Sequence, residues 1–534
     1  MKQHKFNLLF LATVATLSSQ PALAALNSYT HANGSTVVNI NQPDANGLSH
    51  NMYQQFNVTA DGLVLNNSPT DLIRERGDIA RNSNLDKAAS LILNEVISKS
   101  PSSLNGYIDV AGQKADVIIA NPNGITCSGC SFINTGRATL TTGTPSFTDG
   151  VLTDFKVAKG ILTIKGNGLK GADYTELLAQ QINLQGEVKT SQLRAIAGTY
   201  TYNIAAGQAT TTGSRQLRSN SIDVSALGGA TAGLIQLQTT EAGAGVNNSG
   251  VLNATNLYIA SNGALTNSGT LQAEGISAIA SGSITNQGTL SARQADLRTT
   301  KDFTNHGTLN TTDYTTVVSA GKFFNSGNAQ VNAAGSINIV TLTGNVENKG
   351  SISTPQSLVM QTGYSTVDGV VTAVANSSLI NSGAIQAGHL SMNAVKEVTL
   401  LAGGAVTAQG SAQISASYVS NATTLTAQNA SVMANSFRNN GEIATTNLLN
   451  ISGKNGIVNT GTLKAGTLAL ATDGKISNAS CMLWVFCHKG TLSADKITIA
   501  APKIHAISDL DGNYYTKELE LNKPAATAEM TTRL

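Results

Sequence analysis

Charged and aromatic residues are scarce in this 534-residue chain. Only 12% of the residues are Asp, Glu, Lys or Arg, 4% are aromatic, and the formal net charge is +2. A chain with so little excess charge has no electrostatic basis for binding nucleic acid or a strongly acidic surface. Yet 41% of the residues are hydrophobic, which is too large a fraction for an intrinsically disordered chain. The sequence therefore predicts a folded protein without a nucleic-acid partner.

Long apolar runs are equally rare, and the most apolar one lies at the N-terminus. Residues 8–17 are mostly apolar, follow a lysine-containing start and precede Ala22-Leu23-Ala24, a small-x-small cleavage site. This pattern predicts a secretory signal peptide at residues 1–24, which is handled by the Sec machinery. An uncleaved anchor would need about 20 apolar residues, and the polar stretch that begins at Ser18 ends the run early. No later segment is apolar enough to span a bilayer, so we expect an exported protein.

Cysteine is nearly absent, and the four residues form two local pairs, Cys127 with Cys130 and Cys481 with Cys487. In an exported chain such pairs indicate disulfides in preference to metal sites. A redox Cys-x-x-Cys needs a thioredoxin-like βαβ context, and a zinc site needs a second ligand pair nearby; the sequence supplies neither. We therefore expect two local disulfides, no metal and no cofactor. The first bond closes a very short loop and acts as a corner staple.

Small polar residues and glycine dominate instead, and from about residue 245 they recur at a fixed period. An Asn-x-Gly motif returns at first every 19 or 20 residues, and a leucine keeps the same step. The motif begins at Asn248, Asn267, Asn286, Asn305 and Asn325, with later copies at Asn348, Asn381, Asn440 and Asn459, and the leucines are Leu252, Leu271, Leu290 and Leu309. This period is too short for the helical repeat families, whose units are longer than about 30 residues.

The alternation inside each unit predicts strands. In Leu257-Tyr258-Ile259 and Ile337-Asn338-Ile339 the apolar residues alternate, as they do in a strand with one buried side. Two or three such strands joined by Asn-x-Gly corners make one coil of a right-handed parallel β-helix, an all-β solenoid in which equivalent residues stack in register. The stacked asparagines then bond their amides between coils, and the leucines form an internal column.

Two other architectures have a similar period or composition. A leucine-rich repeat would need more leucines per unit than these repeats contain, and a flat β-sandwich array is the remaining alternative. For the β-helix, roughly 510 mature residues at about 20 per coil predict about 25 coils and a rod on the order of 120 Å long.

Composition and periodicity divide the chain into three further parts. Residues 25–240 lack the strict period, and we interpret them as an N-terminal domain that caps the rod, because an open β-helix end would expose unpaired backbone. Within it, residues 88–96 are either a helix or a buried strand. Residues 241–500 are the repeat region. Residues 501–534 lose the repeat and gain charge, so they are either a tail or a second cap.

One stretch of the N-terminal domain concentrates turn-forming residues. Asn121-Pro122-Asn123-Gly124 follows the apolar run Val117-Ile118-Ile119 and precedes the first cysteine pair. Proline fixes φ and glycine accepts positive φ, so these four residues predict a tight corner between two strands.

Short segments of the same domain match a known pattern. They are Val38-Asn39-Ile40, Gly47-Leu48-Ser49-His50-Asn51, Phe56-Asn57-Val58, Leu65-Asn66-Asn67-Ser68, Ala89-Ser90-Leu91-Ile92-Leu93-Asn94-Glu95-Val96, Ala120-Asn121-Pro122-Asn123-Gly124-Ile125 and Phe132-Ile133-Asn134, followed by Arg137 and Thr139-Leu140-Thr141-Thr142-Gly143. With them, the N-terminal 240 or so residues resemble the secretion domain of two-partner secretion exoproteins. That group contains filamentous haemagglutinin, the calcium-independent haemolysins and the contact-dependent inhibition proteins. The family's Asn-Pro-Asn-Leu motif stands here as Asn82-Ser83-Asn84-Leu85, without its proline, and the cysteine pair is more similar to the haemolysin and contact-inhibition branch.

The resemblance implies a right-handed parallel β-helix and a partner. The partner is a β-barrel transporter in the outer membrane of a Gram-negative bacterium, and its periplasmic domains recognise the N-terminal region. The secretion signal implied by the resemblance comprises Asn121, Pro122, Asn123 and Gly124, with Asn66, Asn82, Asn84 and Leu85 as further candidates. The alternative is that these residues are only corners of the cap, because backbone geometry alone constrains turn residues.

An exported and nearly neutral rod with ladders of small polar side chains favours adhesion to a host or neighbouring cell. Arg76-Gly77-Asp78 is a candidate cell-binding tripeptide, although such tripeptides also arise by chance. The alternative function is the stalk of a truncated haemolysin or contact-inhibition toxin, with the apolar residues 481–487 as a membrane contact or a core insertion. A polysaccharide-cleaving β-helix needs neighbouring carboxylates, and the acidic residues here are sparse and scattered. We therefore predict a secreted adhesin and no enzyme.

Overall fold

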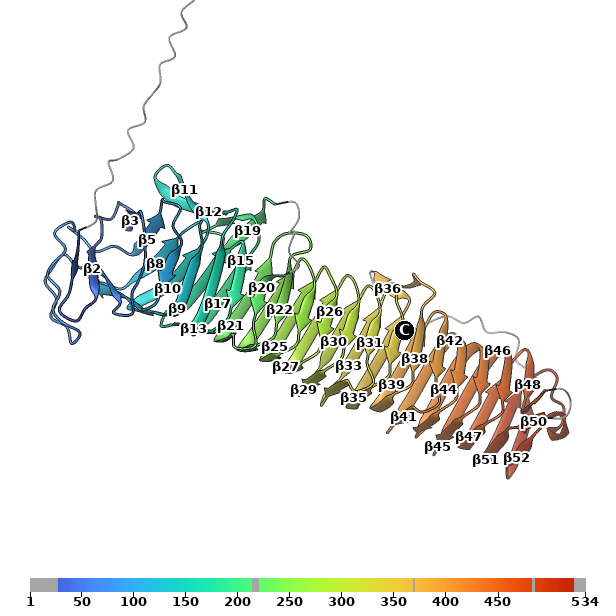
Figure 1. The fold of residues 1–534 in the computed structure, drawn as a ribbon. Coiled ribbons are helices and arrows are strands. Elements are labelled where there is room, and N and C mark those ends of the chain that lie inside the picture. Colours follow the sequence, from blue (N-terminus) through green and yellow to red (C-terminus); the bar gives the residue numbers. More distant parts are fainter. Residues whose placement is uncertain (1–26, 214–219, 368–369, 483–485, 523–534) are drawn as a thin grey trace, which may run out of the picture.

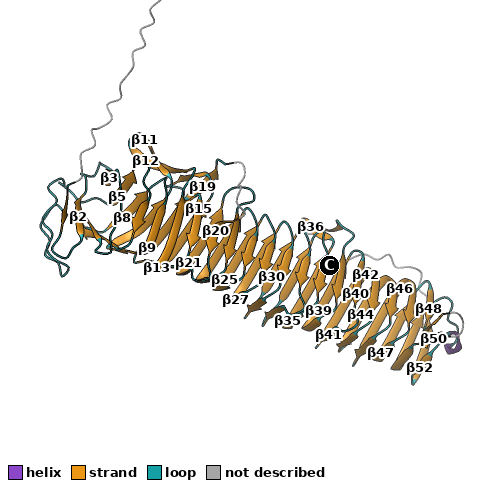
Figure 2. Cartoon of the chain, viewed as in Figure 1, coloured by secondary structure: helices purple, strands orange, loops and turns teal. Residues whose placement is uncertain are grey.

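The computed structural model is a long rod built almost entirely of β-strands (Figure 1). It describes residues 27–213, 220–367, 370–482 and 486–522. The one helix in these ranges is a 3-10 turn, η1 (Ile507–Asp509), near the C-terminal end (Figure 2). Within the same ranges no helix has the length and apolar character needed to cross a membrane. The expected signal peptide at residues 1–24 lies outside the described residues.

Most strands pair in parallel from one coil to the next and belong to a single 45-stranded sheet that winds along the rod. Its N-terminal strands are β1 (Ser28–Thr30), β2 (Thr36–Asn39), β3 (Leu48–Tyr53), β4 (Leu63–Asn67), β5 (Leu91–Val96), β6 (Ser102–Leu104), β7 (Tyr107–Gly112), β8 (Ala115–Ala120), β9 (Ile125–Ile133), β10 (Thr135–Thr141), β13 (Ile161–Lys170), β14 (Tyr174–Ala179), β15 (Gln181–Leu184), β16 (Glu187–Lys189), β17 (Gln192–Ala197), β20 (Asn220–Val224) and β21 (Gly229–Thr239). The segment at residues 88–96, left open between helix and strand, contains strand β5. At the N-terminal end β1 pairs antiparallel with β2, so an added strand covers an edge of the first coil.

The repeat region continues the same sheet without a break. Its strands are β22 (Gly245–Asn248), β23 (Val251–Ser261), β24 (Leu265–Asn267), β25 (Thr270–Ala280), β26 (Ile284–Asn286), β27 (Thr289–Thr299), β28 (Phe303–Asn305), β29 (Thr308–Thr311), β30 (Thr315–Ser319), β31 (Phe323–Asn325), β32 (Gln330–Ala333), β33 (Ile337–Thr341), β34 (Val346–Asn348), β35 (Ser351–Thr362), β38 (Ser378–Asn381), β39 (Ala384–Ala394), β40 (Glu397–Leu400), β41 (Ala405–Ala408), β42 (Ser411–Asn421), β43 (Thr424–Ala427), β44 (Asn429–Asn439), β45 (Glu442–Thr445), β46 (Leu448–Asn459), β47 (Thr462–Ala471), β48 (Lys475–Ser477), β51 (Thr491–Ala500), β52 (Asn513–Tyr515) and β53 (Glu518–Asn522).

One regular coil consists of a three-residue strand, a corner and an eleven-residue strand, as in β24 and β25. The long strand turns at its middle, where the register between β25 and β27 skips Glu274. Each coil therefore presents three faces. Buried and accessible residues alternate along each face, because successive side chains of a strand point to opposite sides.

The interior of the rod is a continuous apolar core, mostly aliphatic, that runs from Val38 to Leu510. In its regular part Leu252, Leu271, Leu290 and Leu309 stack in register and are at most 4% exposed. The predicted leucine column is thus confirmed, and so is the predicted all-β parallel solenoid. The alternation of the sequence specified it because only one register buries the apolar residues of every coil.

A second, smaller sheet packs on the outside of the N-terminal coils. Its strands are β11 (Thr144–Thr148), β12 (Val151–Val157), β18 (Tyr200–Asn203) and β19 (Gln208–Thr211), and they pair antiparallel in that order. We call it the extra-helical sheet. It comes from two insertions, one after β10 and one after β17, and it lies along one edge of the rod (Figure 1). Two hairpins also leave the coils, namely β36 (Tyr364–Val367) with β37 (Val370–Ala373), and β49 (Ala479–Met482) with β50 (Phe486–Lys489).

A column of buried asparagines runs beside the leucine column. The Nδ2 of Asn248 donates to the Oδ1 of Asn267 at 2.8 Å, and the same bond at the same distance joins Asn267 to Asn286 and Asn286 to Asn305. The column continues through Asn325, Asn348 and Asn381. These bonds confirm the amide ladder predicted from the Asn-x-Gly repeat, and every one points from an earlier coil to a later one.

The asparagine column is interrupted once. Leu400, which is fully buried, pairs in register with Asn381 on one side and Asn421 on the other. A second column then runs from Asn421 through Asn439 and Asn459 to Asn478. Because a leucine neither donates nor accepts, the two columns are separate.

The structure corrects three details of the sequence interpretation. The later repeat places Asn439 in the column, not Asn440 as the spacing suggested, and Asn421 and Asn478 join it without a following Asn-x-Gly signature. The rod has about 20 turns in place of about 25, because insertions between coils consume residues, so its length is roughly 100 Å. Finally, the coil pattern does not end at residue 500, since β52 and β53 still pair parallel with β51.

The interruption at Leu400 generates a rank-order prediction. Leu400→Ala should cost about 2–5 kcal/mol, as for other buried leucines. Leu400→Asn should be about 1–2 kcal/mol less harmful than Leu400→Ala, because the new amide accepts from Asn381 and donates to Asn421. Native-state hydrogen exchange in β38, β40 and β42 measures the difference. At Leu309, which stacks on Leu290 and Val331, the order should be reversed; the same order at both sites would contradict the prediction.

Candidate functional site

The corner at Asn121-Pro122-Asn123-Gly124 joins β8 to β9 and is tied to the chain before it. The backbone N–H of Gly124 donates to the carbonyl of Asn121 at 3.1 Å, and the N–H of Asn123 donates to the Oδ1 of Asn121 at 3.0 Å. The Asn121 Nδ2 donates to the Ser100 carbonyl and to the Ser102 hydroxyl, both at 2.9 Å. Gly124 has a φ of +113°, a conformation that residues with a Cβ avoid. The corner is therefore closed by side-chain amides as well as by its backbone.

The corner at Asn82-Ser83-Asn84-Leu85 repeats these bonds without the proline. The N–H of Leu85 donates to the Asn82 carbonyl at 3.1 Å, and the N–H of Asn84 donates to the Asn82 Oδ1 at 3.0 Å. The Asn82 Nδ2 reaches back to the carbonyls of Ile40 and Asn66, both at 2.9 Å. The missing proline thus leaves the shape of the turn intact.

The structure brings some of the sequence-predicted signal residues together and keeps others apart. Asn66 and Asn82 are neighbours, and the Asn66 Nδ2 donates to the Oδ1 of Asn39 at 2.8 Å. The 121–124 corner follows separately, between β8 and β9. Asn66, Asn82 and Asn121 are fully buried, and Leu85 belongs to the core. In the folded chain these side chains are therefore closed to a partner; Asn84 is exposed, and Pro122 and Asn123 are partly exposed.

The first cysteine pair lies in β9, beyond the corner it was expected to staple. Cys127 and Cys130 form a disulfide, and both face the core with at most 1% exposure. Between them Gly129 turns the strand at a φ of +81°. Cys481 and Cys487 pair directly across β49 and β50, whereas their side chains and residues 483–485 lie outside the described part of the chain.

The Arg76-Gly77-Asp78 tripeptide occupies an exposed turn. The N–H of Gly77 donates to the Arg74 carbonyl at 3.0 Å, and the Asp78 Oδ1 accepts from the Arg74 N–H at 3.2 Å. The Arg76 guanidinium lies 5.5 Å from the ring centre of Tyr107. A short ion pair between the partly buried Arg74 and the buried Asp109, at 2.5 Å, attaches this loop to the first coils. Both charged side chains of the tripeptide therefore already have contacts within the protein.

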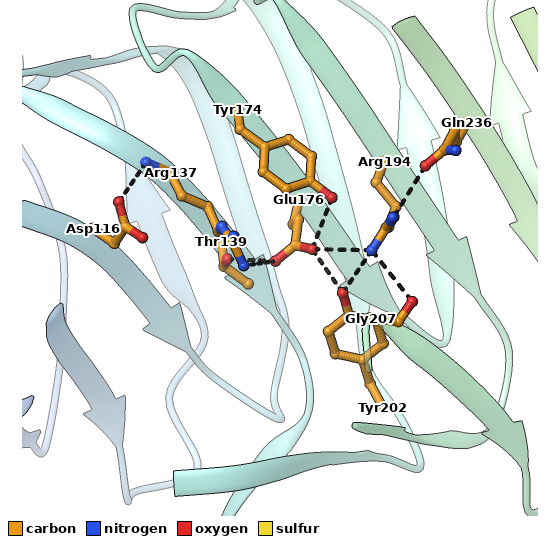
Figure 3. Close-up of polar contacts among 9 residues, drawn as sticks. All are labelled: Asp116, Arg137, Thr139, Tyr174, Glu176, Arg194, Tyr202, Gly207 and Gln236. Carbon is orange, nitrogen blue, oxygen red and sulfur yellow. Dashed lines mark hydrogen bonds and ion pairs between the residues drawn. The ribbon is translucent and has the colours of Figure 1, made fainter. Parts of the chain in front are cut away.

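A buried carboxylate at Glu176 forms a polar network that sequence reasoning missed (Figure 3). Glu176 lies in β14, is 3% exposed, and stands in register with Thr139 of β10 and Arg194 of β17. Its Oε1 accepts from the hydroxyls of Tyr202 at 2.7 Å and Tyr174 at 3.0 Å. Its Oε2 accepts from the Thr139 hydroxyl at 3.0 Å.

Two arginines balance the charge of Glu176. Arg194 lies 3.7 Å from one carboxylate oxygen, and Arg137 lies 3.9 Å from the other. Their guanidinium groups also lie 5.9 and 5.0 Å from the ring centre of Tyr174. Arg194 donates further to the Tyr202 hydroxyl at 3.0 Å and to the Gly207 carbonyl at 3.3 Å. Gly207 allows this approach, because a Cβ there would come within 2.9 Å of the guanidinium.

The network attaches the extra-helical sheet to the coils. Tyr202 and Gly207 belong to the insertion that forms β18 and β19, whereas Glu176 and Arg194 belong to coil strands. Beside the network Tyr200 and Phe155 pack on Leu178 and Ile196 in a separate apolar cluster. Burial, followed by the charge of Glu176, raises the pKa of Tyr202 to about 12, and burial likewise raises the pKa of Tyr174. Both phenols therefore remain donors, and the arrangement is a latch and not an acid–base pair.

No spacing in the sequence could have revealed this latch. Thr139, Glu176 and Arg194 are separated by unequal numbers of residues, since insertions of different length intervene. Only the coil register places them side by side. The sole local signal was that Tyr174 and Glu176 are two residues apart on one strand, so that both polar side chains point to the same side.

A proline at position 83 should stabilise the corner at residues 82–85. Ser83→Pro should raise the free energy of unfolding by about 0.4–1 kcal/mol, because proline restricts the unfolded chain. The folded corner should accept the proline, since Pro122 occupies the equivalent place in the corner at residues 121–124. Asn84→Pro is the control and should destabilise, since it removes the N–H that donates to Asn82. Urea denaturation of both variants measures the shift; a loss of stability with Ser83→Pro would refute the equivalence of the corners.

Removing the charge of Glu176 should release the extra-helical sheet. Glu176→Gln should cost about 3–5 kcal/mol locally, because it leaves two partly buried arginines without their counter-charge. Hydrogen exchange in β12 and β18 should then rise, while exchange in β25 and β27 stays unchanged. Glu187→Gln, at an exposed carboxylate that accepts from Thr231, is the control. Unchanged protection of β18 in Glu176→Gln would show that the apolar cluster alone holds the sheet.

Comparison with known proteins finds relatives of part of the chain. A family described as "TPS secretion domain" matches residues 12–273. The chain is 40% identical over 277 residues to "Toxin CdiA" of Yersinia pestis, covering 49% of this chain and 8% of that protein. It is 42% identical over 242 residues to "tRNA nuclease CdiA" of Yersinia mollaretii, covering 44% and 8%. The chain thus spans less than a tenth of the length of these relatives.

A solved structure was also found. It is described as a crystal structure of the filamentous hemagglutinin secretion domain, with 31% sequence identity, 58% of this chain and 98% of that chain covered, and a TM-score of 0.44. TPS exoproteins are secreted across the outer membrane of Gram-negative bacteria. The family match and the relatives identify residues 12–273 as a TPS secretion domain, which supports a two-partner secretion exoprotein.

Proposed function

We propose that an outer-membrane β-barrel transporter exports this chain and that the folded rod acts at the cell surface, or after release, as an adhesin. Residues 25–240 serve as the secretion domain, residues 241–500 as the repeat rod and residues 501–534 as its C-terminal end. In this proposal residues 1–24 direct the chain through the Sec machinery to the periplasm, where the transporter's periplasmic domains receive it.

The observation that carries the proposal is the coil-by-coil dependence of the fold. Each strand of the sheet bonds to the coil before it, so a coil that emerges from a pore can fold as soon as its predecessor is in place. A chain of stacked repeats gains stability with every added neighbour. Folding on the outside of the membrane would therefore oppose backward movement.

The burial of the corner asparagines supports a recognition step that precedes folding. Asn66, Asn82 and Asn121 are closed off in the folded chain, so a transporter that reads them does so before the corners form. We propose that Asn66, Asn82, Asn84, Leu85 and the 121–124 corner act twice, first as an extended signal and later as structural corners. The disulfides at Cys127–Cys130 and Cys481–Cys487 would form once the chain has left the cytoplasm.

A second candidate function follows from the names of the relatives. Proteins named as toxins and as tRNA nucleases match this chain only in its N-terminal part. We propose as the alternative that the rod is the stalk of a contact-dependent inhibition toxin. No enzymatic activity is proposed for residues 27–522, and cell binding through Arg76-Gly77-Asp78 remains a proposal. Growth of mixed cultures distinguishes a toxin stalk, which inhibits neighbouring cells, from an adhesin, which only attaches to them.

Export should depend on the N-terminal domain. It should also fall in an Asn121 variant by more than the loss of stability explains. Deleting residues 25–240 should abolish secretion without lowering synthesis. Asn121→Ala should cost about 1–3 kcal/mol, because it leaves buried partners unpaired, and it should also lower the amount of secreted protein. The matched control is Asn348→Ala, another buried asparagine, in the repeat rod. Immunoblots of medium and cells give the export ratio; equal export of the two variants at equal loss of stability would overturn recognition of the corner.

A further inference from the structure

A shallow groove lies on the rod directly beside the extra-helical sheet. It has a volume of about 280 Å³ and is bounded by Arg194 and Gly207 at the latch and by Ile279 three coils further along. Its floor is the outer face of β21, β23 and β25, the same face that the extra-helical sheet covers in earlier coils. The groove therefore begins where the extra-helical sheet ends.

The register explains the shape of the groove. Arg194, Gln236, Tyr258 and Ser277 stack in one outer row, and Ile196, Gln238, Ala260 and Ile279 stack in the next. Only Ser277 in the first row and Ala260 in the second are small, so these two residues leave a hollow between Tyr258 and Ile279. Tyr258 is 48% exposed and Ile279 is 54% exposed, which gives the hollow an aromatic wall and an aliphatic wall.

The polar groups of the groove are neutral and mostly unpaired. Arg194 donates its Nε–H to the Gln236 Oε1 at 3.2 Å (Figure 3), which directs the Gln236 amide N–H groups away from the guanidinium. Among the described residues, the side chains of Gln238, Tyr258 and Ser277 have no hydrogen-bond partner. The charge of Arg194 is already compensated by Glu176. The groove thus offers amide and hydroxyl groups around an aromatic ring, without a free charge.

We propose that this groove binds a neutral saccharide. A sugar ring has an apolar face of C–H groups, which packs on an aromatic ring, and a rim of hydroxyls that both donate and accept. Tyr258 supplies the ring face, and Gln236, Gln238 and Ser277 supply the amides and hydroxyls. The volume suits one or two sugar rings, and the latched coils hold the groups in place before binding, which reduces the entropy cost of association. The proposal goes beyond export, because it concerns only the folded chain.

The open edge of β19 suggests a different occupant, an extended peptide that adds a strand. Two observations favour the saccharide. The open polar groups of the groove are side-chain amides and hydroxyls on the coil face, whereas an added strand would bond mainly to backbone. The groove is also narrow along the rod, since only β21, β23 and β25 form its floor. Peptide binding is therefore an outcome that would overturn the proposal.

The test uses the purified, folded chain on an array of neutral and charged oligosaccharides, followed by calorimetric titration with lactose, maltose and N,N′-diacetylchitobiose. At least one neutral sugar should bind. Tyr258→Ala should weaken that binding by about tenfold or more, and Ala260→Arg should block it by filling the hollow, as Arg298 occupies the same row on β27. Tyr314→Ala, which removes another exposed tyrosine of the repeat region, should leave the affinity unchanged.

Several results would overturn the proposal. They are the absence of binding to every neutral sugar, binding that survives Tyr258→Ala, and binding restricted to charged glycans. A peptide library that binds at β19 while no sugar binds would assign the groove to a polypeptide instead. All variants carry substitutions at outward-facing positions, so we expect them to fold. Unchanged melting temperatures confirm that they do. The measurement is made on purified protein, so a failure of the export proposal would not affect it.

Discussion

Backbone hydrogen bonds between successive coils are the interaction on which the rest of this molecule depends. Each strand finds its partners in the coil before it and offers the same pattern to the coil after it, so neither the core nor the corners exist without their neighbours. The aliphatic column, the asparagine column and the latch at Glu176 all arise from one register. A change that shifts this register would displace all three together.

Buried polar groups are the feature that distinguishes one part of the rod from another. In the repeat region they are amides bonded in a line, and in the N-terminal region they are corner asparagines and two arginine–carboxylate pairs, Arg74 with Asp109 and Arg194 with Glu176. Arg74 belongs to a loop that leaves the coils, and its ion pair with Asp109 attaches that loop. Glu176 and Arg194 both belong to coil strands, and they attach the extra-helical sheet by hydrogen bonds to Tyr202 and Gly207. Unpaired, such groups would be costly inside a protein, so they specify where each outer segment docks.

Much of the architecture could be predicted from the sequence, because a short period imposes itself on every coil. The leucine column and most of the asparagine column followed from spacing alone. The period fails where insertions intervene, and there the prediction failed too: Glu176 and Arg194 are neighbours only through pairing that no spacing encodes. Asn421 and Asn478 were missed because their corners lack the glycine that marked the others, and residues 88–96 stayed ambiguous because a short apolar run fits both a helix and a strand.

The leucine at position 400 has a mechanical meaning for a rod of this kind. Every amide in the asparagine columns points the same way, so within each column the dipoles add and the bonds reinforce one another. At Leu400 this reinforcement stops and begins again one coil later. Along the asparagine columns, backbone hydrogen bonds and side-chain amide bonds together join each coil to the next. At Leu400 two consecutive pairs of coils are joined by backbone hydrogen bonds and apolar packing alone, and a pull along the axis would meet these weaker contacts. Within residues 248–478 this is the joint at which the asparagine columns would part, leaving a polarised segment on either side.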